Sequence, residues 1–150
     1  KLSDSVYNQR LAECAAAART LGVDSLRDAT KEMLEKFAAD TEMKRAKHVI
    51  SENARVQAAV DCLVRNDPSS LGGLMDESHD SLCDDYEVSS PELDRLVGSL
   101  RGAGALGARL TGAGFGGCVL ALCEMTSANT VVSRAVEMNP DSYLIDLIGN

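Results

Sequence analysis

Glycine is concentrated in one short part of this chain, and that concentration limits what the segment can fold into. Seven of the 12 glycines lie between positions 102 and 117 of the 150-residue sequence. Glycine has no side chain to pack and loses the most backbone entropy on folding, so such a cluster is costly in a regular strand. Short apolar runs at 107–111 and 118–123 flank the second half of the cluster. The pattern predicts a β-hairpin with a glycine-rich connection.

The connection reads Thr-Gly-Ala-Gly-Phe-Gly-Gly-Cys from Thr111 to Cys118. Without Cβ atoms, its main chain can come close to another backbone or to a phosphate. Positive φ angles can also turn successive N–H groups toward an anion. The spacing differs from the Walker pattern and from the strand-turn-helix dinucleotide fingerprint. Two interpretations therefore stay open, a phosphate-binding turn and a merely tight, bulged hairpin, and the spacing alone favours the hairpin.

Apolar residues elsewhere in the chain recur at helical spacing. Asp24 is expected to cap the second helix, and Asp67 and Ser90 precede prolines that fit the first turn of a helix. Local strand pairing beside packed helices indicates an α+β fold, with helices packed on a small antiparallel sheet. The predicted helices cover about 5–21, 25–38, 41–65, 67–86, 90–100 and 127–138, and a last strand covers 142–146.

Charged residues in the predicted helix 41–65 lie mostly off its apolar stripe. The pattern favours a solvated face for these residues. Glu52 and Arg55 are three residues apart, a spacing at which an ion pair contributes about 0.2–0.5 kcal/mol. The charged residues concerned are Lys44, Arg45, Glu52, Arg55 and Asp61.

Composition excludes several classes of partner. The formal net charge of -8 repels a phosphate backbone, so we expect no nucleic-acid partner. No apolar run approaches the roughly 20 residues that span a bilayer, so we expect no membrane partner. The five cysteines are odd in number and include no C-x-x-C pair, which predicts neither a disulfide framework nor a zinc site and favours the cytoplasm. Because the first methionine is Met33, we expect a fragment or a processed piece.

A second segment, 78–94, is rich in acids and hydroxyls. Ser78, His79 and Asp80 are consecutive, so their side chains point in different directions on a helix and cannot form a catalytic triad. His79 has no cysteine partner and no second histidine nearby, so no metal site is predicted there. By residue types alone, Ser90 reads as a helix start and Asp84 and Asp85 as surface acids.

Several stretches resemble the galactokinase members of the GHMP kinase family. Residues 74–94 are similar to the pattern LM-x-x-SH-x-SLRDDYEVS-x-PELD, and residues 107–118 resemble the third motif of the family. The resemblance covers nearly the whole chain. Two further matches are the helix pattern RA-x-H-x-x-x-E-x-x-R, carried by Arg45, Ala46, His48, Glu52 and Arg55, and the stretch after the central strand, carried by residues 2–7, Arg10 and Cys14.

The resemblance implies that residues 1–150 form the C-terminal domain of a GHMP kinase, whose full-length relatives phosphorylate the C1 hydroxyl of galactose with ATP and Mg²⁺. It implies that Tyr7 contacts the sugar. It also implies that the glycine-rich turn supports the phosphate-binding region of an N-terminal half, to which the catalytic and magnesium-binding residues belong. We therefore expect the isolated chain to be inactive. The residues of the turn are Gly112, Gly114, Phe115, Gly116 and Gly117.

Two departures from the family pattern stand out. Cys83 replaces the usual arginine of the SLRDDYEVS segment, and the tail 143–150 fits the family ending poorly. Two alternatives to a galactokinase stay open, a non-catalytic sugar sensor or interaction module and a kinase for N-acetylgalactosamine. Without the N-terminal half, we expect an uncovered sheet edge and domain interface that favour self-association.

Overall fold

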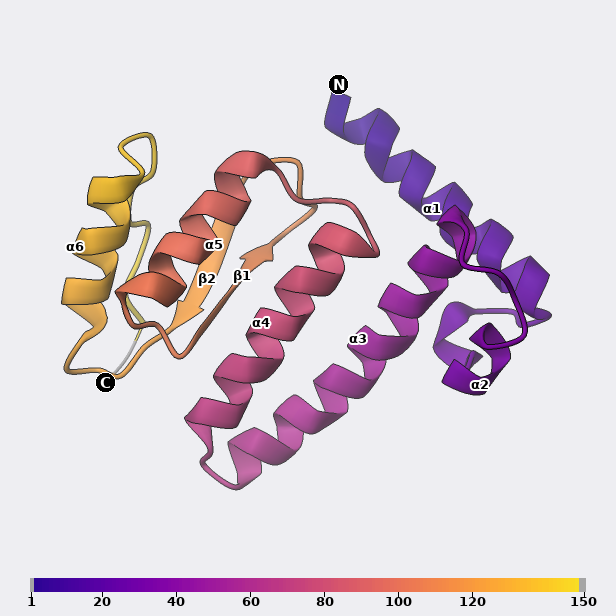
Figure 1. Cartoon of the computed structure of the whole chain (residues 1–150), viewed down its shortest axis with the longest axis horizontal. Helices are drawn as coiled ribbons and strands as arrows, with labels where there is room; N and C mark the ends of the chain where they lie inside the picture. The colour runs from indigo at the N-terminus through magenta and orange to yellow at the C-terminus, as the bar shows by residue number, and fades with distance from the viewer. Residues whose placement is uncertain (1, 149–150) are drawn as a thin grey trace.

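The computed structural model describes residues 2–148 and has an α+β architecture (Figure 1). Helices α3 and α4 form an antiparallel pair in the middle of the molecule. Helices α1 and α2 lie on one side of this pair, and a two-stranded sheet with α5 and α6 lies on the other. The elements are α1 (Leu2–Leu21), η1 (Leu26–Asp28), α2 (Lys31–Leu34), α3 (Thr41–Val64), α4 (Pro68–Asp84), α5 (Pro91–Ala103), β1 (Gly107–Thr111), β2 (Cys118–Leu122) and α6 (Ala128–Met138).

Polar side chains begin the long helices where the sequence predicted. The Asp67 carboxylate accepts the Ser70 N–H at 3.0 Å, and the Ser90 hydroxyl accepts the Leu93 N–H at 3.3 Å. A proline follows each of these caps, where its missing N–H costs no helical hydrogen bond. The helices predicted over 41–65, 67–86 and 90–100 and the hairpin 107–123 are confirmed.

The prediction of a single helix over 25–38 is wrong. The chain forms the short 3₁₀ helix η1 and then α2, with Ala29 and Thr30 extended between them. Ser25, and not Asp24, caps η1, because its hydroxyl accepts the Arg27 N–H at 3.3 Å. Serine and threonine compete with helical hydrogen bonds and favour caps, and here they divide the segment in two.

The strand predicted over 142–146 is also wrong. Strands β1 and β2 pair antiparallel, with Gly107 opposite Leu122 and Thr111 opposite Cys118, and residues 2–148 contribute no third strand. Side chains of the tail, such as Tyr143 and Ile148, are exposed. A short apolar run becomes a strand only beside a partner, and helix α4 already lies along the outer edge of β1.

Three hydrophobic clusters hold the elements together. The first joins α1, η1 and α3, the second joins α5, α6 and the sheet, and the third lies where the loop after α4 meets β1. Aliphatic side chains and alanine form nearly all of this core, as the low aromatic content requires. The buried members include Ala17, Leu21, Leu26, Met43 and Ala46 in the first cluster, Val97, Leu100, Ala108, Val131 and Ala135 in the second, and Leu82, Val88, Leu93 and Leu110 in the third.

The solvated face predicted for α3 is wrong for three of its charged residues. Arg45 is only 1% exposed, and Glu52 and Arg55 are half-buried. The Glu52 carboxylate accepts hydrogen bonds from Ser78 Oγ at 2.7 Å, from Arg55 Nε at 2.8 Å and from Arg109 Nη1 at 2.8 Å. The i,i+3 pair of Glu52 and Arg55 is thereby confirmed. The prediction failed because α1 and α4 cover two sides of α3, so more of its surface is buried than its apolar stripe alone.

The apolar stripe predicted for this helix consists of Ala46, Val49, Val56, Val60 and Leu63, and its second half is exposed in turn. Val56, Val60 and Leu63 are 52%, 51% and 66% exposed. The first half of the stripe, with Ala46 buried and Val49 half-buried, packs against α1. The chain therefore presents an apolar strip along the C-terminal half of α3.

Helix α4 and strand β1 touch backbone to backbone. A Cβ atom on Gly72 would overlap the carbonyl of Leu106, and one on Gly107 would overlap the carbonyl of Gly72. Glycine is needed at both positions because any side chain would push the helix off the strand. By contrast, a Cβ atom on the neighbouring Gly73 meets no atom within 4 Å.

This contact makes a matched pair of predictions. Gly72→Ala is expected to destabilise the protein by about 1–3 kcal/mol, since the methyl group forces α4 away from β1. Gly73→Ala is expected to stabilise it by about 0.5–1 kcal/mol, since alanine favours a helix interior. Urea unfolding followed by circular dichroism measures both. Equal effects of the two substitutions would contradict the close contact.

Candidate functional site

The glycine-rich turn between β1 and β2 has backbone angles that residues other than glycine rarely adopt. Gly112, Gly114, Gly116 and Gly117 have φ angles of 89°, 82°, 119° and 101°, and Phe115 lies at 58°. Left-handed conformations cost an L-residue roughly 1–2 kcal/mol, and glycine removes that cost. The conformation of the turn thus accounts for the glycine cluster that the sequence displays.

One side of this turn rests on the loop that connects α4 to α5. The Phe115 N–H donates to the Val88 carbonyl at 2.7 Å, and a Cβ atom on Gly114 would overlap the same carbonyl. The Phe115 side chain packs against the third hydrophobic cluster. Cβ atoms on Gly112, Gly116 and Gly117 would meet no atom within 4 Å. The turn is therefore anchored on one side and presents bare main chain on the other, and a phosphate-supporting role stays a prediction.

Tyr7 lies on α1 and is 50% exposed. Tyr86 lies in the loop that follows α4, and its ring stacks on His48 with 4.5 Å between the ring centroids. Burial raises the pKa of Tyr86 to about 12, with smaller contributions from Cys14 and Tyr7. Arg10 of α1 and Phe115 of the turn both donate to carbonyls of the loop 85–88, so the helix of Tyr7 and the glycine-rich turn both adjoin this loop. The sugar role of Tyr7 stays a prediction.

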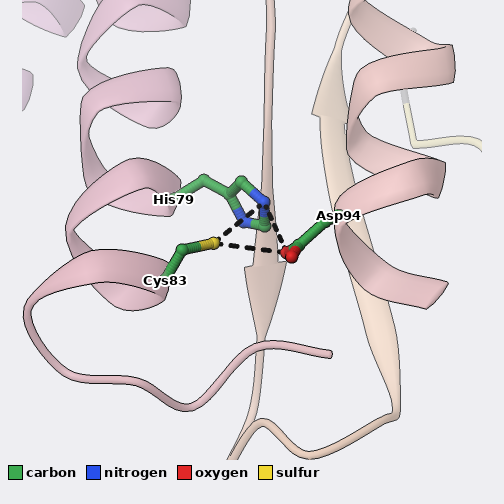
Figure 2. Close-up of side chains that lie close together, drawn as sticks. All are labelled: His79, Cys83 and Asp94. Atoms are coloured by element: carbon green, nitrogen blue, oxygen red, sulfur yellow. Dashed lines mark hydrogen bonds and ion pairs between the residues drawn. The ribbon is translucent and has the colours of Figure 1, made fainter. Parts of the chain in front are cut away.

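His79 has a cysteine neighbour after all. Figure 2 shows His79 and Cys83, one turn apart on α4, pointing toward Asp94 of α5. The Cys83 sulfur lies 3.5 Å from His79 Nε2 and 3.2 Å from Asp94 Oδ1, and Nε2 lies 3.4 Å from Oδ1. Such separations are close to the edges of about 3.3–3.6 Å between the ligands of a tetrahedral zinc ion. The i,i+4 spacing of His79 and Cys83 was the signal that could have found the pair.

The hydrogen bonds of His79 nevertheless argue against metal binding. Its Nδ1 accepts the Leu110 N–H at 3.3 Å, so the neutral ring carries its proton on Nε2, the atom that faces Asp94. A metal on Nε2 would move that proton to Nδ1, opposite the Leu110 N–H. Burial and the hydrogen bond to Asp94 also raise the pKa of the Cys83 thiol to about 11, which keeps it protonated. The three side chains therefore form a hydrogen-bonded cluster, in which Asp94 also accepts from Ser89.

The consecutive residues Ser78, His79 and Asp80 diverge, as the helical spacing predicts. Ser78 donates to Glu52, and Asp80 pairs with Arg101 at 3.2 Å, so neither side chain approaches His79 as a triad would require. Over residues 2–148, no helix combines the length and the apolar character needed to cross a bilayer.

Comparison with models of known protein families identifies the family of this chain. Residues 59–141, more than half of its length, match the family model described as "GHMP kinases C terminal". The chain belongs to the GHMP kinase family. The match includes α4, α5, the hairpin and α6, so the glycine-rich turn and the loop on which it rests both lie in the region that defines this family.

Galactokinases are among the proteins that the chain resembles. The galactokinase of Thermotoga petrophila is 45% identical over 148 residues, which cover 98% of this chain and 42% of the relative. That of Glaesserella parasuis is 49% identical over 124 residues, or 77% of this chain and 32% of the relative. The chain therefore spans less than half the length of the relatives that it matches.

Solved structures agree in fold. The crystal structure of Lactococcus lactis galactokinase complexed with galactose matches with a TM-score of 0.82 and 35% identity, covering 90% of this chain and 37% of that one. L. major mevalonate kinase in complex with R-mevalonate matches with a TM-score of 0.56 and 26% identity over 72% of this chain and 37% of that one. The resemblance to galactokinases and the α+β fold class are thereby confirmed.

The anchoring of the glycine-rich turn predicts different effects at two glycines. Gly114→Ala and Gly112→Ala both place alanine at positive φ, and each is expected to cost about 1–2 kcal/mol of stability. Only Gly114→Ala also breaks the contact with Val88, so only this variant should speed hydrogen exchange of the Phe115 amide. NMR measures the hydrogen-exchange rate of the Phe115 amide in both variants. Equal rates in the two variants would contradict the anchoring of the turn on Val88.

The hydrogen bonds of His79 predict its tautomer and its titration. Long-range ¹⁵N NMR should show a neutral ring with the proton on Nε2, and added Zn²⁺ should leave the spectrum unchanged. Burial, assisted by Arg101, lowers the pKa of His79 below its ordinary value of 6.5. The unfolded chain then binds the proton first, so this residue reduces the folding stability as the pH falls below about 6.5. A proton on Nδ1, or a shift with Zn²⁺, would contradict this assignment.

Proposed function

We propose that this chain is the C-terminal portion of a galactokinase, which transfers the terminal phosphoryl group of ATP to the C1 hydroxyl of galactose. The observation that carries the proposal is the 45% identity to a galactokinase over 98% of the chain. The likeness to a galactokinase structure with bound galactose supports it independently. The mevalonate kinase structure is only 26% identical to the chain, so it is a weaker guide to the substrate than the galactokinases are.

Within this proposal, the chain supplies one wall of the site. Tyr7 hydrogen-bonds the sugar through its phenol, which is half-exposed and accessible. The turn formed by residues 112–117 supports the phosphate-binding region of the remaining polypeptide with its bare main chain. The catalytic acid–base residue and the Mg²⁺ ligands belong to that remaining polypeptide, so no residue of this chain is assigned to catalysis or to the metal.

The proposal includes two properties of the chain by itself. Because phosphoryl transfer depends on positioned charges that the rest of a galactokinase supplies, the 150-residue chain alone is inactive. The five cysteines are all unpaired thiols, as is usual in a reducing compartment, and we assign the protein to the cytoplasm.

A chimera tests the proposed function. The matching C-terminal region of Thermotoga petrophila galactokinase is replaced by this chain, and ADP formation is measured with galactose and with N-acetylgalactosamine. We expect galactose-dependent turnover within about tenfold of the Thermotoga enzyme, since the two sequences are 45% identical over the exchanged region. The isolated chain should give no turnover under the same conditions.

Two controls make the result decisive. The Thermotoga N-terminal part without this chain should be inactive, which excludes activity from that part alone. A folded chimera that binds galactose without turnover would favour a sugar sensor, and a preference for N-acetylgalactosamine would favour the related kinase. Normal turnover by the isolated chain would contradict its assigned role as one wall of a larger site.

A further inference from the structure

We propose that Arg45 and Arg10 are positioning residues that hold the helix of Tyr7 and the glycine-rich turn in a fixed relative placement. The two arginines do so through the loop 85–88, which lies between them and the turn. This inference rests on the proposed function for the meaning of Tyr7 and the turn. The clamp itself, defined as Arg10, Arg45, Glu13 and Glu87 around this loop, rests on contacts in the structure.

Four successive carbonyl groups of the loop are each held by a different N–H group. Arg45 Nη1 donates to the Asp85 carbonyl at 2.6 Å, and Arg10 donates to the Tyr86 carbonyl at 2.7 Å and to the Glu87 carbonyl at 3.0 Å. The next carbonyl, that of Val88, accepts the Phe115 N–H of the glycine-rich turn at 2.7 Å. Helices α1 and α3 are thereby connected to the turn across one short stretch of main chain.

The two arginines of the clamp lie inside the protein and face carboxylates. Arg45 and Arg10 are 1% and 8% exposed. Glu13 accepts from Arg45 at 2.7 Å and from Arg10 at 2.9 Å, and Glu87 accepts from Arg45 at 2.8 Å. Burial raises the pKa of Glu13, but hydrogen bonds from Arg45 and Gln9 outweigh it and lower the pKa overall. The four side chains of the clamp therefore balance in formal charge, and the exposed Lys44 also pairs with Glu87 at 3.4 Å.

An ion cluster built on two buried arginines is poorly explained by stability alone. Desolvation of the charges offsets much of their attraction, and well-packed apolar side chains often stabilise such a site as well or better. Apolar side chains cannot bond successive carbonyls, whereas the planar guanidinium group presents several N–H donors in a fixed fork. Glu87 also has a φ angle of 55°, a conformation that non-glycine residues adopt only where neighbours enforce it. The clamp thus fixes the shape of the loop.

The clamp links the two segments to which we assign substrate roles. Arg10 lies about one helical turn after Tyr7 on α1, and Phe115 lies in the glycine-rich turn. The path from one to the other runs from Arg10 through the Tyr86 and Glu87 carbonyls to Val88 and Phe115. Loss of either arginine should therefore displace Tyr7, which contacts the sugar in our proposal, relative to the glycine-rich turn, which supports the phosphate-binding region.

Hydrogen exchange tests the clamp without any need for activity. In the 150-residue chain, Arg45→Lys and Arg10→Lys keep the positive charge but lose the forked N–H donors of the guanidinium group. Each should speed exchange of the Phe115 amide at least tenfold relative to the Leu106 amide, which bonds Leu122 in the sheet at 2.7 Å. Arg95→Lys is the matched control, because Arg95 is exposed and pairs only with Glu92 among the described residues. Equal changes at Phe115 and Leu106 would overturn the clamp.

Kinetics in the chimera test the positioning role. Arg45→Lys and Arg10→Lys should lower kcat and raise the KM for galactose, with a total loss in kcat/KM of at least tenfold, while Arg95→Lys leaves both constants unchanged. If exchange at Phe115 is faster but kcat and KM are normal, the clamp is structural only and the positioning role is refuted. If the parent chimera lacks activity, the proposed function fails, and the exchange experiment still decides the clamp. Should one lysine variant fail to fold, the other serves both measurements.

Discussion

Side chains of helix α4 close the β1 edge of this two-stranded sheet. The Asp76 carboxylate accepts the Ala108 N–H at 2.8 Å, and His79 Nδ1 accepts the Leu110 N–H at 3.3 Å. A two-stranded sheet is marginal by itself, and an open edge invites pairing with other chains. Helix α4 therefore replaces a third strand. Its close approach at Gly72 and Gly107 brings Asp76 and His79 within reach of the strand.

The position of α4 sets the course of the loop 85–88. Because α4 ends beside β1, this loop passes under the glycine-rich turn and offers the Val88 carbonyl to Phe115, while its other side meets the buried arginines of α1 and α3. The chain belongs to the GHMP kinases and spans 42% of the Thermotoga petrophila galactokinase that it resembles. In the proposed function it contributes position and shape, and the reacting charges are supplied elsewhere. Such a separation of roles suits phosphoryl transfer, which depends on the positioning of the reacting groups and on the stabilisation of their charge.

Much of the fold was predictable from the sequence by itself. Helical spacing, the caps Asp67 and Ser90, and the glycine cluster determined the long helices and the hairpin, because these signals act within one turn or one strand. The motif segments 74–94 and 107–118 identified the family. The positive φ angles of the turn explain why its glycines could be recognised before any packing was known.

Other features were decided only by tertiary structure. The burial of Arg45 depends on α1 and α4 covering α3, and the cluster of His79, Cys83 and Asp94 depends on α5 packing beside α4. The tail 142–146 has the short apolar run of a strand but forms none, since it pairs with neither β1 nor β2. Periodicity reports which residues share a face of one element. Only packing decides whether one, two or three neighbours cover that element, and hence which of its charges are buried.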